Sequence, residues 1–198
     1  MKSKYKIIFF LKTNFLIFIT SLLYFCAPIE VSDKVVFDNN LLNKISINAA
    51  IRNINNVYEV NYLDPYVDTE LSVTPLTRLN NWIKSNIIVF GSRNKLDINV
   101  IEASITKTER DIDNKKKFEE KKEFYNKINF IIEYIIYNND NLILATSKVK
   151  TKRSKTSSIF TSLDEKEKIM ETLILDALID ISKKSDEVLK IHMTDYII

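Results

Sequence analysis

Basic residues form the clearest chemical pattern in this chain of 198 residues, in the stretch KVKTKRSK. Lys148, Lys150 and Lys152 alternate, so they would share one face of a β-strand, and Arg153 follows them directly. A positive stripe of this kind can bind phosphates or anionic lipid headgroups. Lysine also protects solvated strand edges from aggregation, and this stretch lacks the aromatic side chains on which single-stranded nucleic acids stack. We therefore expect an anion-binding strand or a solvated edge, and no nucleic-acid partner.

Catalytic chemistry has few candidate residues in this chain. A single glycine, Gly91, excludes a P-loop, a dinucleotide fingerprint and a nucleophile elbow. The single histidine, His192, lies near the end of the chain, so Ser-His or Cys-His catalysis and His-rich metal sites lack their components. Glu133 is the one acid set between apolar neighbours on an expected strand, and we expect it to point to solvent. The sequence thus predicts no catalytic residue, no metal site and no cofactor.

The N-terminal segment has the composition of a targeting sequence. Residues 1–6 are basic, and residues 7–29 are mostly apolar, most densely at 15–25. The dense part has the length of a signal-peptide core, and the whole stretch is close to the roughly 20 residues that a membrane span needs. Four lysines and no acid precede Cys26, so the remainder holds 25 basic and 26 acidic residues. The positive balance therefore belongs to this segment and gives no reason to expect a polyanion partner.

Cys26, the only cysteine, lies where the apolar stretch ends. Bacterial lipoprotein signals usually place Leu three positions before the cysteine and small or branched residues between them. Leu23 and Cys26 fit this pattern, whereas Tyr24 and Phe25 do not. Ordinary cleavage after Ala27 would also place Phe25 where a small residue is needed. Lipidation at Cys26, an uncleaved anchor and simple secretion all stay open, and each places the remainder outside the cytoplasm.

The first half of the remainder predicts a strand, a helix and a second strand. Residues 45–51 alternate apolar and polar, which is typical of a half-buried strand. Thr74-Pro75 is a helix-start signal, and the apolar residues after it keep helical spacing up to Gly91, which we expect to close the helix. Residues 96–105 form a strand whose apolar positions change phase at Val100-Ile101, which predicts a β-bulge.

The second half predicts a hairpin and a long helix. The charged run at 111–123 is expected to be a loop or a hairpin tip. Residues 124–137 alternate cleanly, and the polar turn at 138–141 joins them to a further strand that carries the basic stretch. Ser162, with Glu165 three residues later, resembles a capping box and opens the last helix. A break near 182–185 is expected to separate a short final helix.

The order strand, helix, strand, strand, strand, helix predicts an α+β fold. We expect a mostly antiparallel four-stranded sheet with helices packed on one face, preceded by an N-terminal apolar targeting or anchor helix. The expected organisation is a signal peptide or membrane anchor at 1–26, a linker at 27–43 and a single α+β domain at 44–198.

A family resemblance rests on two stretches of the chain. VTPLTRLNNWIKSNIIVFGSRNKLDINVIEASITKTE holds Pro75, Trp82, Gly91 and the Ala103 strand, and a hairpin ending in ATSKVKTKRSKTSS and a long helix follow. Here the chain resembles a group of small, uncharacterised alphaproteobacterial envelope lipoproteins, which carry a small residue where this chain has Phe25. The order of elements is similar to that of envelope lipoproteins that assist lipopolysaccharide assembly or transporters, a likeness of fold alone.

These observations predict a membrane-tethered, non-enzymatic accessory or binding protein of the cell envelope, exposed on the periplasmic side. The protein would assist assembly or transport in the envelope. Its partners would be the membrane and an envelope protein. The sheet face or residues 58–66 would contact that protein. One alternative is a binder of anionic envelope lipids or lipopolysaccharide through the basic stretch. Another is a hydrolase of envelope polymers, which would need two carboxylates in a cleft.

Overall fold

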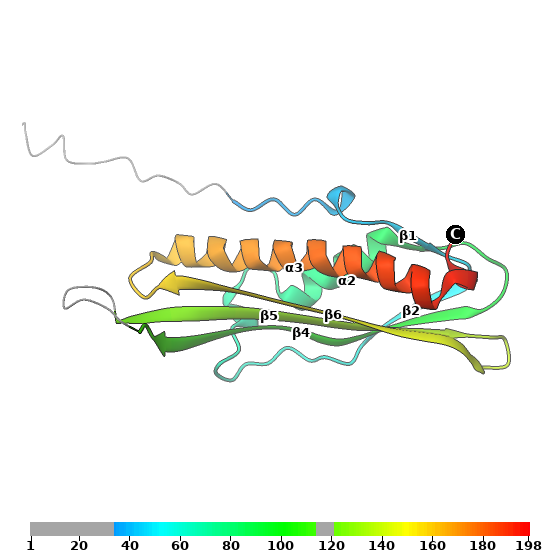
Figure 1. Cartoon of the computed structure of the whole chain (residues 1–198), viewed down its shortest axis with the longest axis horizontal. Helices are drawn as coiled ribbons and strands as arrows, with labels where there is room; N and C mark the ends of the chain where they lie inside the picture. The colour runs from blue at the N-terminus through cyan, green and yellow to red at the C-terminus, as the bar shows by residue number, and fades with distance from the viewer. Residues whose placement is uncertain (1–33, 114–120) are drawn as a thin grey trace, which may run out of the picture. The chain divides into compact units, whose positions relative to one another are not determined.

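A four-stranded sheet is the centre of the fold in the computed structural model, which describes residues 34–113 and 121–198 (Figure 1). The strand order is β2-β4-β5-β6, with β2 parallel to β4 and the other pairs antiparallel. Its strands are β2 (Ile51–Asn56), β4 (Lys95–Asp111), β5 (Lys122–Tyr137) and β6 (Ile143–Ser158). Cys26, the anchor segment and part of the charged run lie outside the described residues.

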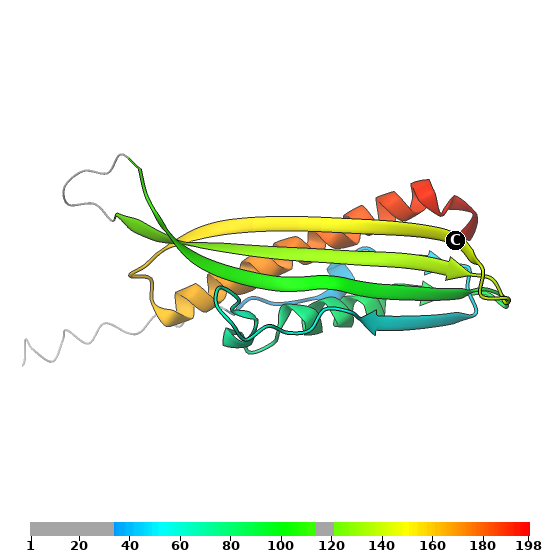
Figure 2. The same cartoon turned by 90° about the horizontal axis from the view of Figure 1, so that it is seen from below.

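Two helices, α2 (Pro75–Asn86) and α3 (Leu163–His192), lie on one face of this sheet (Figures 1 and 2). This arrangement confirms the predicted α+β class. β5 shows the pattern most clearly, because it buries every second residue beneath the helices from Asn126 to Ile136. The compact unit spans Lys34–Ile198. Within the described residues no helix is apolar over the length needed to cross a membrane.

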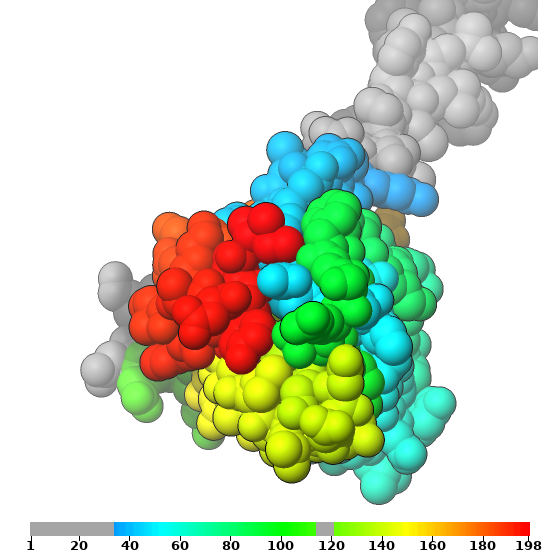
Figure 3. Space-filling model, turned by 90° about the vertical axis from the view of Figure 1, so that its right-hand side faces the viewer, coloured from blue at the N-terminus to red at the C-terminus, as the bar shows by residue number. Residues whose placement is uncertain are grey.

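Residues 45–51 form two strands rather than the single strand expected. The chain leaves the extended pattern after β1 (Ile45–Ile47) and resumes it in β2. β1 pairs in parallel with β3 (Ile87–Val89) in a separate two-stranded sheet. The amide of Asn48 donates to the carbonyl of Tyr196 (2.7 Å), and the amide of Ile198 donates to that of Ser46 (3.0 Å). The C-terminus thereby holds β1 apart from β2, at the end of the molecule shown in Figure 3.

Helix α2 begins where predicted but ends earlier. Thr74 Oγ1 accepts a hydrogen bond from the amide of Thr77 (3.2 Å), which confirms the cap. The helix stops at Asn86, whose Nδ2 donates to the carbonyl of Leu42 (3.0 Å), and β3 follows directly. Gly91 is therefore not a helix cap, and the expectation was wrong. A Cβ there would lie 2.6 Å from Asn48 Oδ1, so glycine permits a close approach of two chain segments.

The bulge predicted in β4 is confirmed. The register against β5 shifts between Val100 and Glu102. At the same place β2 ends, and the amides of Val57 and Tyr58 both donate to the carbonyl of Val100 (3.0 Å each). The bulge thus marks where β2 leaves the sheet edge.

Helix α3 confirms the predicted start but has no break. Ser162 Oγ accepts from the amide of Glu165 (3.3 Å). The helix then continues through Ser182 and Ser185, where two helices were expected, so that prediction was wrong. Ser182 Oγ donates to the carbonyl of Ile179 (2.8 Å), and Ser185 Oγ accepts from the buried hydroxyl of Tyr134 (2.9 Å). Both serine hydroxyls have hydrogen-bond partners while their backbone stays helical, so the serines do not interrupt the helix.

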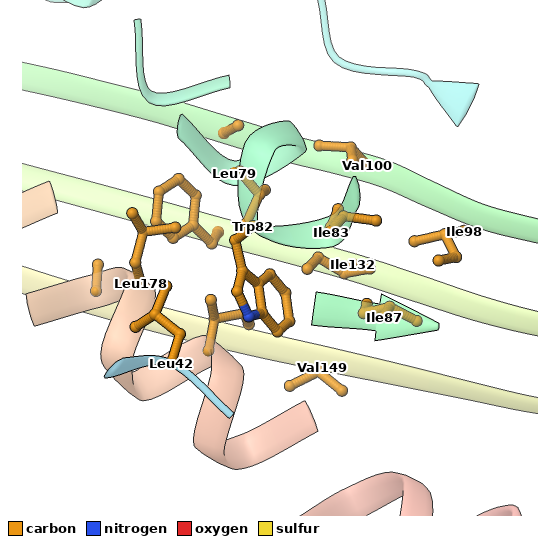
Figure 4. Close-up of a cluster of buried hydrophobic side chains, with 14 of the residues drawn as sticks. Leu42, Leu79, Trp82, Ile83, Ile87, Ile98, Val100, Ile132, Val149 and Leu178 are labelled. Carbon is orange, nitrogen blue, oxygen red and sulfur yellow. The ribbon is translucent and has the colours of Figure 1, made fainter. Parts of the chain in front are cut away.

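The core lies between the sheet and the helices, around Trp82 (Figure 4). Trp82 is fully buried, and its Nε1 donates to the carbonyl of Asn43 (3.3 Å). Leu42 is 5% exposed and belongs to the same cluster. The latter part of the predicted linker at 27–43 therefore packs on the helices. Short 3-10 helices, η1 (Asn39–Leu41), η2 (Asp68–Glu70) and η3 (Thr194–Tyr196), complete the unit.

Candidate functional site

The face of the sheet opposite α2 and α3, here called the open face, carries most of the predicted basic stretch. Lys148, Lys150 and Lys152 pair in register with Glu133, Ile131 and Asn129 of β5. The alternate β6 residues between them, Val149 and Thr151, are buried beneath α3. None of the three lysines forms an ion pair within the described parts of the chain. The structure thus brings three of the four predicted basic residues together.

Arg153 lies on the other side of the sheet. Its Nε and Nη2 donate to the two carboxylate oxygens of Asp180 on α3, at 2.5 and 2.8 Å. This hydrogen-bonded pair lowers the pKa of Asp180 below its usual value and raises that of Arg153. Because Arg153 follows Lys152 directly, the period of two in a strand turns it to the opposite face.

Lys127 on β5 is a further basic residue of the open face, missed in the sequence. It pairs in register with Ser154 of β6, one open-face position along from the pair of Asn129 and Lys152. Alternate residues of β5 lie on the same face, so Lys127 shares the face of Asn129 and lies opposite the buried Ile128. Aligning the outward-facing alternate residues of β5 with those of β6 would have identified Lys127 from the sequence.

The carboxylates of the open face are held by amides in hydrogen-bonded rows across the strands. Asn55 Nδ2 donates to Asn99 Oδ1 (3.0 Å), and Asn99 Nδ2 donates to Glu133 Oε2 (3.1 Å). Glu102 Oε1 accepts from Asn129 Nδ2 (3.1 Å) in the same manner. Glu133 therefore lies on the polar face, as expected, with an amide partner rather than a second acid.

The structure gathers neither His192 nor the described acidic side chains into a group that could hold a metal ion. His192 is exposed at the last residue of α3. Within residues 34–113 and 121–198, no three His, Cys, Asp or Glu side chains are placed to hold a metal ion. Several of the described carboxylates, among them Glu102, Glu133 and Asp180, act instead as hydrogen-bond acceptors or ion-pair partners.

Residues 58–66, the second predicted contact region, are tied to the sheet at both ends. The hydroxyl of Tyr58 donates to Asp68 Oδ2, and Asp68 Oδ1 accepts from the amide of Ile105 (2.7 Å). The pKa of Tyr58 is raised, mainly because the hydroxyl is buried and to a smaller extent because it hydrogen-bonds Asp68. The amide of Lys107 donates to the carbonyl of Pro65 (2.8 Å), so the segment continues the sheet edge beyond β2. Between these ends, Tyr62 is 79% exposed.

A pocket of about 420 Å³ lies beneath the first turns of α3. Its apolar surface comes from Phe124 of β5 and from Leu163 and Met170 of α3. The ammonium groups of Lys107 and Lys166 lie 5.8 and 5.2 Å from the centre of the Phe124 ring. Nothing in the sequence pattern marks this pocket, because it arises where β4 and β5 turn away from the start of α3 (Figure 2).

The solved structures similar to this chain include three bacterial proteins. The minor lipoprotein from Acinetobacter baumannii is 11% identical, with 74% of this chain and 92% of that chain covered and a TM-score of 0.39. A Xanthomonas campestris protein of the DUF330 family is 13% identical, with coverages of 82% and 95% and a TM-score of 0.39. The rare lipoprotein B from Shewanella oneidensis is 14% identical, with coverages of 73% and 94% and a TM-score of 0.36.

No protein-family model and no curated protein matches the chain. The identities and TM-scores of the three structures are too low to transfer an activity or a site to this chain. The resemblance to alphaproteobacterial envelope lipoproteins therefore stays a prediction.

Proposed function

We propose that this chain is a non-enzymatic accessory protein of a bacterial envelope, tethered to a membrane and exposed on the periplasmic side. The basic and apolar residues 1–29, with Cys26 near their end, support the tether. The hydrogen-bonded carboxylates Glu102 and Glu133 support a structural and binding role for the acids of the open face. The protein would act by holding a partner in the envelope.

The open face is the surface that we assign to this partner, and its position relative to the chain's entry point carries the assignment. The chain enters the domain on the helical side, where the Phe37 ring lies 3.7 Å from the guanidinium carbon of Arg78 on α2 (Figure 1). The open face therefore points away from the entry point. It also offers amides fixed by hydrogen bonds, and lysines that have no ion-pair partner in the described part of the chain; both suit a polar or acidic partner surface.

Site-specific crosslinking in cells tests this assignment. A photoreactive amino acid at Lys150 or Asn129 of the open face should capture a specific envelope protein. The matched control places the same amino acid at Lys183 or Glu187, which are exposed on α3, and should not capture it. Equal capture from both faces, or none from the open face, would contradict the proposal.

A second candidate function is the binding of anionic envelope lipids or lipopolysaccharide. It is favoured by Lys148, Lys150 and Lys152 of the open face, which form no ion pair with another described residue. Each lysine near an anionic lipid surface contributes about 1 kcal/mol, so changing Lys148, Lys150 and Lys152 to Gln should weaken binding by more than about tenfold. The measurement uses the full chain in discs of uncharged phospholipid, with lipopolysaccharide added.

The matched control for this experiment removes the same charge elsewhere, by changing Lys44, Lys168 and Lys183 to Gln. These lysines are exposed and do not belong to the sheet. They should leave the binding of lipopolysaccharide unchanged. Equal losses in the two triple variants would indicate that net charge, rather than the open face, determines the binding.

A further inference from the structure

We propose that the pocket beneath the first turns of α3 binds a single-chain amphiphile with a zwitterionic headgroup. This site is separate from the open face, because its lining residues lie between the sheet and α3. The inference goes beyond the proposed function and does not depend on it.

The pocket exists because the core ends before the strands do. Along β5 the positions beneath α3 are apolar from Ile128 to Ile136, but the next position outward is Asn126, which is 2% exposed. On β6, Ser157 pairs in register with Phe124, accepts a hydrogen bond from Asn126 Nδ2 (3.4 Å) and is 9% exposed. Figure 2 shows β4 and β5 turning away from the start of α3 at this end. A core of apolar side chains would have closed the space that these two small polar residues leave open.

The walls of the pocket match an apolar chain. Phe124 and Met170 line it, and Leu163 extends the apolar surface to the outside, where it is 81% exposed. Phe160, in the turn just before α3, is 78% exposed. A volume of about 420 Å³ is near the lower end of the roughly 300–1,000 Å³ of small-ligand sites, which suits one chain rather than two.

The charges at the pocket favour a headgroup that carries both signs. Glu70 Oε2 and Lys107 Nζ are 2.6 Å apart and neutralise each other. Lys166 and Glu167 line the same pocket, and neither has an ion pair within the described residues. Among the described residues, the Nζ of Lys166 donates a hydrogen bond to the carbonyl of Ile159 alone (3.1 Å). One cation and one anion are thus left for a ligand, so a phosphate and an amine on the same headgroup would complement both.

Photoaffinity labelling of the full chain in membrane vesicles tests the proposal. The probes are a lysophosphatidylethanolamine, a fatty acid and an alkylamine, each with the same diazirine-bearing chain. Mass spectrometry should find the zwitterionic probe on the peptides that hold Phe124 and Met170, well above the peptide at the far end of α3. The anionic and cationic probes should label these peptides less.

Variants of the charged pair sharpen the test. Lys166→Gln and Glu167→Gln should each reduce labelling by the zwitterionic probe about tenfold, the effect of losing one charge-assisted interaction. Glu167→Gln should also raise the share taken by the fatty acid, because an opposing charge is removed. The neighbours Lys168→Gln and Glu165→Gln, which are exposed, serve as controls and should change nothing.

Filling the pocket provides an independent check. Ser157→Leu and Met170→Trp should abolish labelling by all three probes, and the circular dichroism of each variant shows whether it is folded. Equal labelling of the wild-type pocket by the three probes would overturn the proposed headgroup. Labelling that persists in both folded filling variants, or no labelling above the far-end peptide, would overturn the site.

Discussion

The two faces of the central sheet are made by the same strands but differ in the burial and in the polarity of their side chains. Beneath the helices, Phe130, Ile132 and Tyr134 of β5 are fully buried. Their neighbours Ile131 and Glu133 are only half-buried on the open face. One face therefore removes apolar surface from water, and the other organises polar groups in rows across the strands.

The difference shows how a long sheet can be stable with one face uncovered. The helix-covered face supplies the hydrophobic free energy, because its side chains are removed from water by α2 and α3. The open face satisfies its amides and carboxylates through hydrogen bonds such as that between Asn53 Nδ2 and Asp97 Oδ1 (2.9 Å). Its side chains thus contribute less to stability and are available to a partner. Pairs of adjacent residues on opposite faces test this separation.

The largest difference is expected for Phe130 and Ile131. Phe130→Ala should lower the free energy of unfolding by roughly 3–5 kcal/mol, because it leaves a cavity beneath α3. Ile131→Ala should lower it by about 1 kcal/mol, since its side chain is only half removed from water. Denaturant titration of the full chain, followed by the fluorescence of the single tryptophan, Trp82, measures both changes. Similar losses for the two variants would show that the open face is also covered.

A smaller difference is expected for Tyr134 and Glu133. Burial raises the pKa of Tyr134, and its hydroxyl donates to Ser185 Oγ (2.9 Å). Tyr134→Phe should lower the free energy of unfolding by roughly 1–2 kcal/mol, because it leaves a buried serine oxygen without its donor. Glu133→Gln keeps an oxygen that can accept the hydrogen bond from Asn99. It should therefore change the free energy of unfolding by less than about 0.5 kcal/mol.

A double-mutant cycle checks the reason for the Tyr134 loss. If the hydroxyl acts through Ser185, the variant with both Tyr134→Phe and Ser185→Ala should be more stable than the sum of the single losses predicts. Additive losses would attribute the effect of Tyr134→Phe to something other than this hydrogen bond.

The sequence predicted those parts of the fold in which a pattern repeats over many residues. The strand at 124–137, the bulge in β4 and the start of α3 all rest on long runs of apolar alternation or on a cap. The shared face of Lys148, Lys150 and Lys152 follows from the same period. These features are local, so the sequence alone contains enough information to predict them.

The errors occur where a distant contact overrides the local pattern. β3 has three residues, too few to show a period, and it forms because β1 lies beside it. The serines of α3 looked like a break, but Tyr134 from β5 satisfies Ser185 inside a continuous helix. The pocket could not be predicted at all, because it depends on how far the strands diverge from α3. Arg153 was the avoidable error, since its parity already placed it opposite Lys152.

The smallest difference is expected for Arg153 and Lys152, the adjacent basic residues of β6. Asp180 has a pKa below its ordinary value because Arg153 hydrogen-bonds its ionised form. This stabilisation is fully present above the ordinary pKa of 3.8 and is lost as the pH falls through the lower pKa of the folded state. Arg153→Gln should therefore reduce stability slightly at neutral pH and flatten its fall below about pH 4.

Lys152→Gln is the matched control, because it removes the same charge from the adjacent residue, which has no ion pair to any residue that the structure describes. It should leave both the stability and its acid dependence unchanged, as measured by denaturant titration at a series of pH values. Salt should weaken the effect of Arg153→Gln, since the pair is partly exposed. If Lys152→Gln instead reproduced the acid dependence of Arg153→Gln, the two faces would share one electrostatic field, and Lys152 would not be free to bind a partner independently of α3.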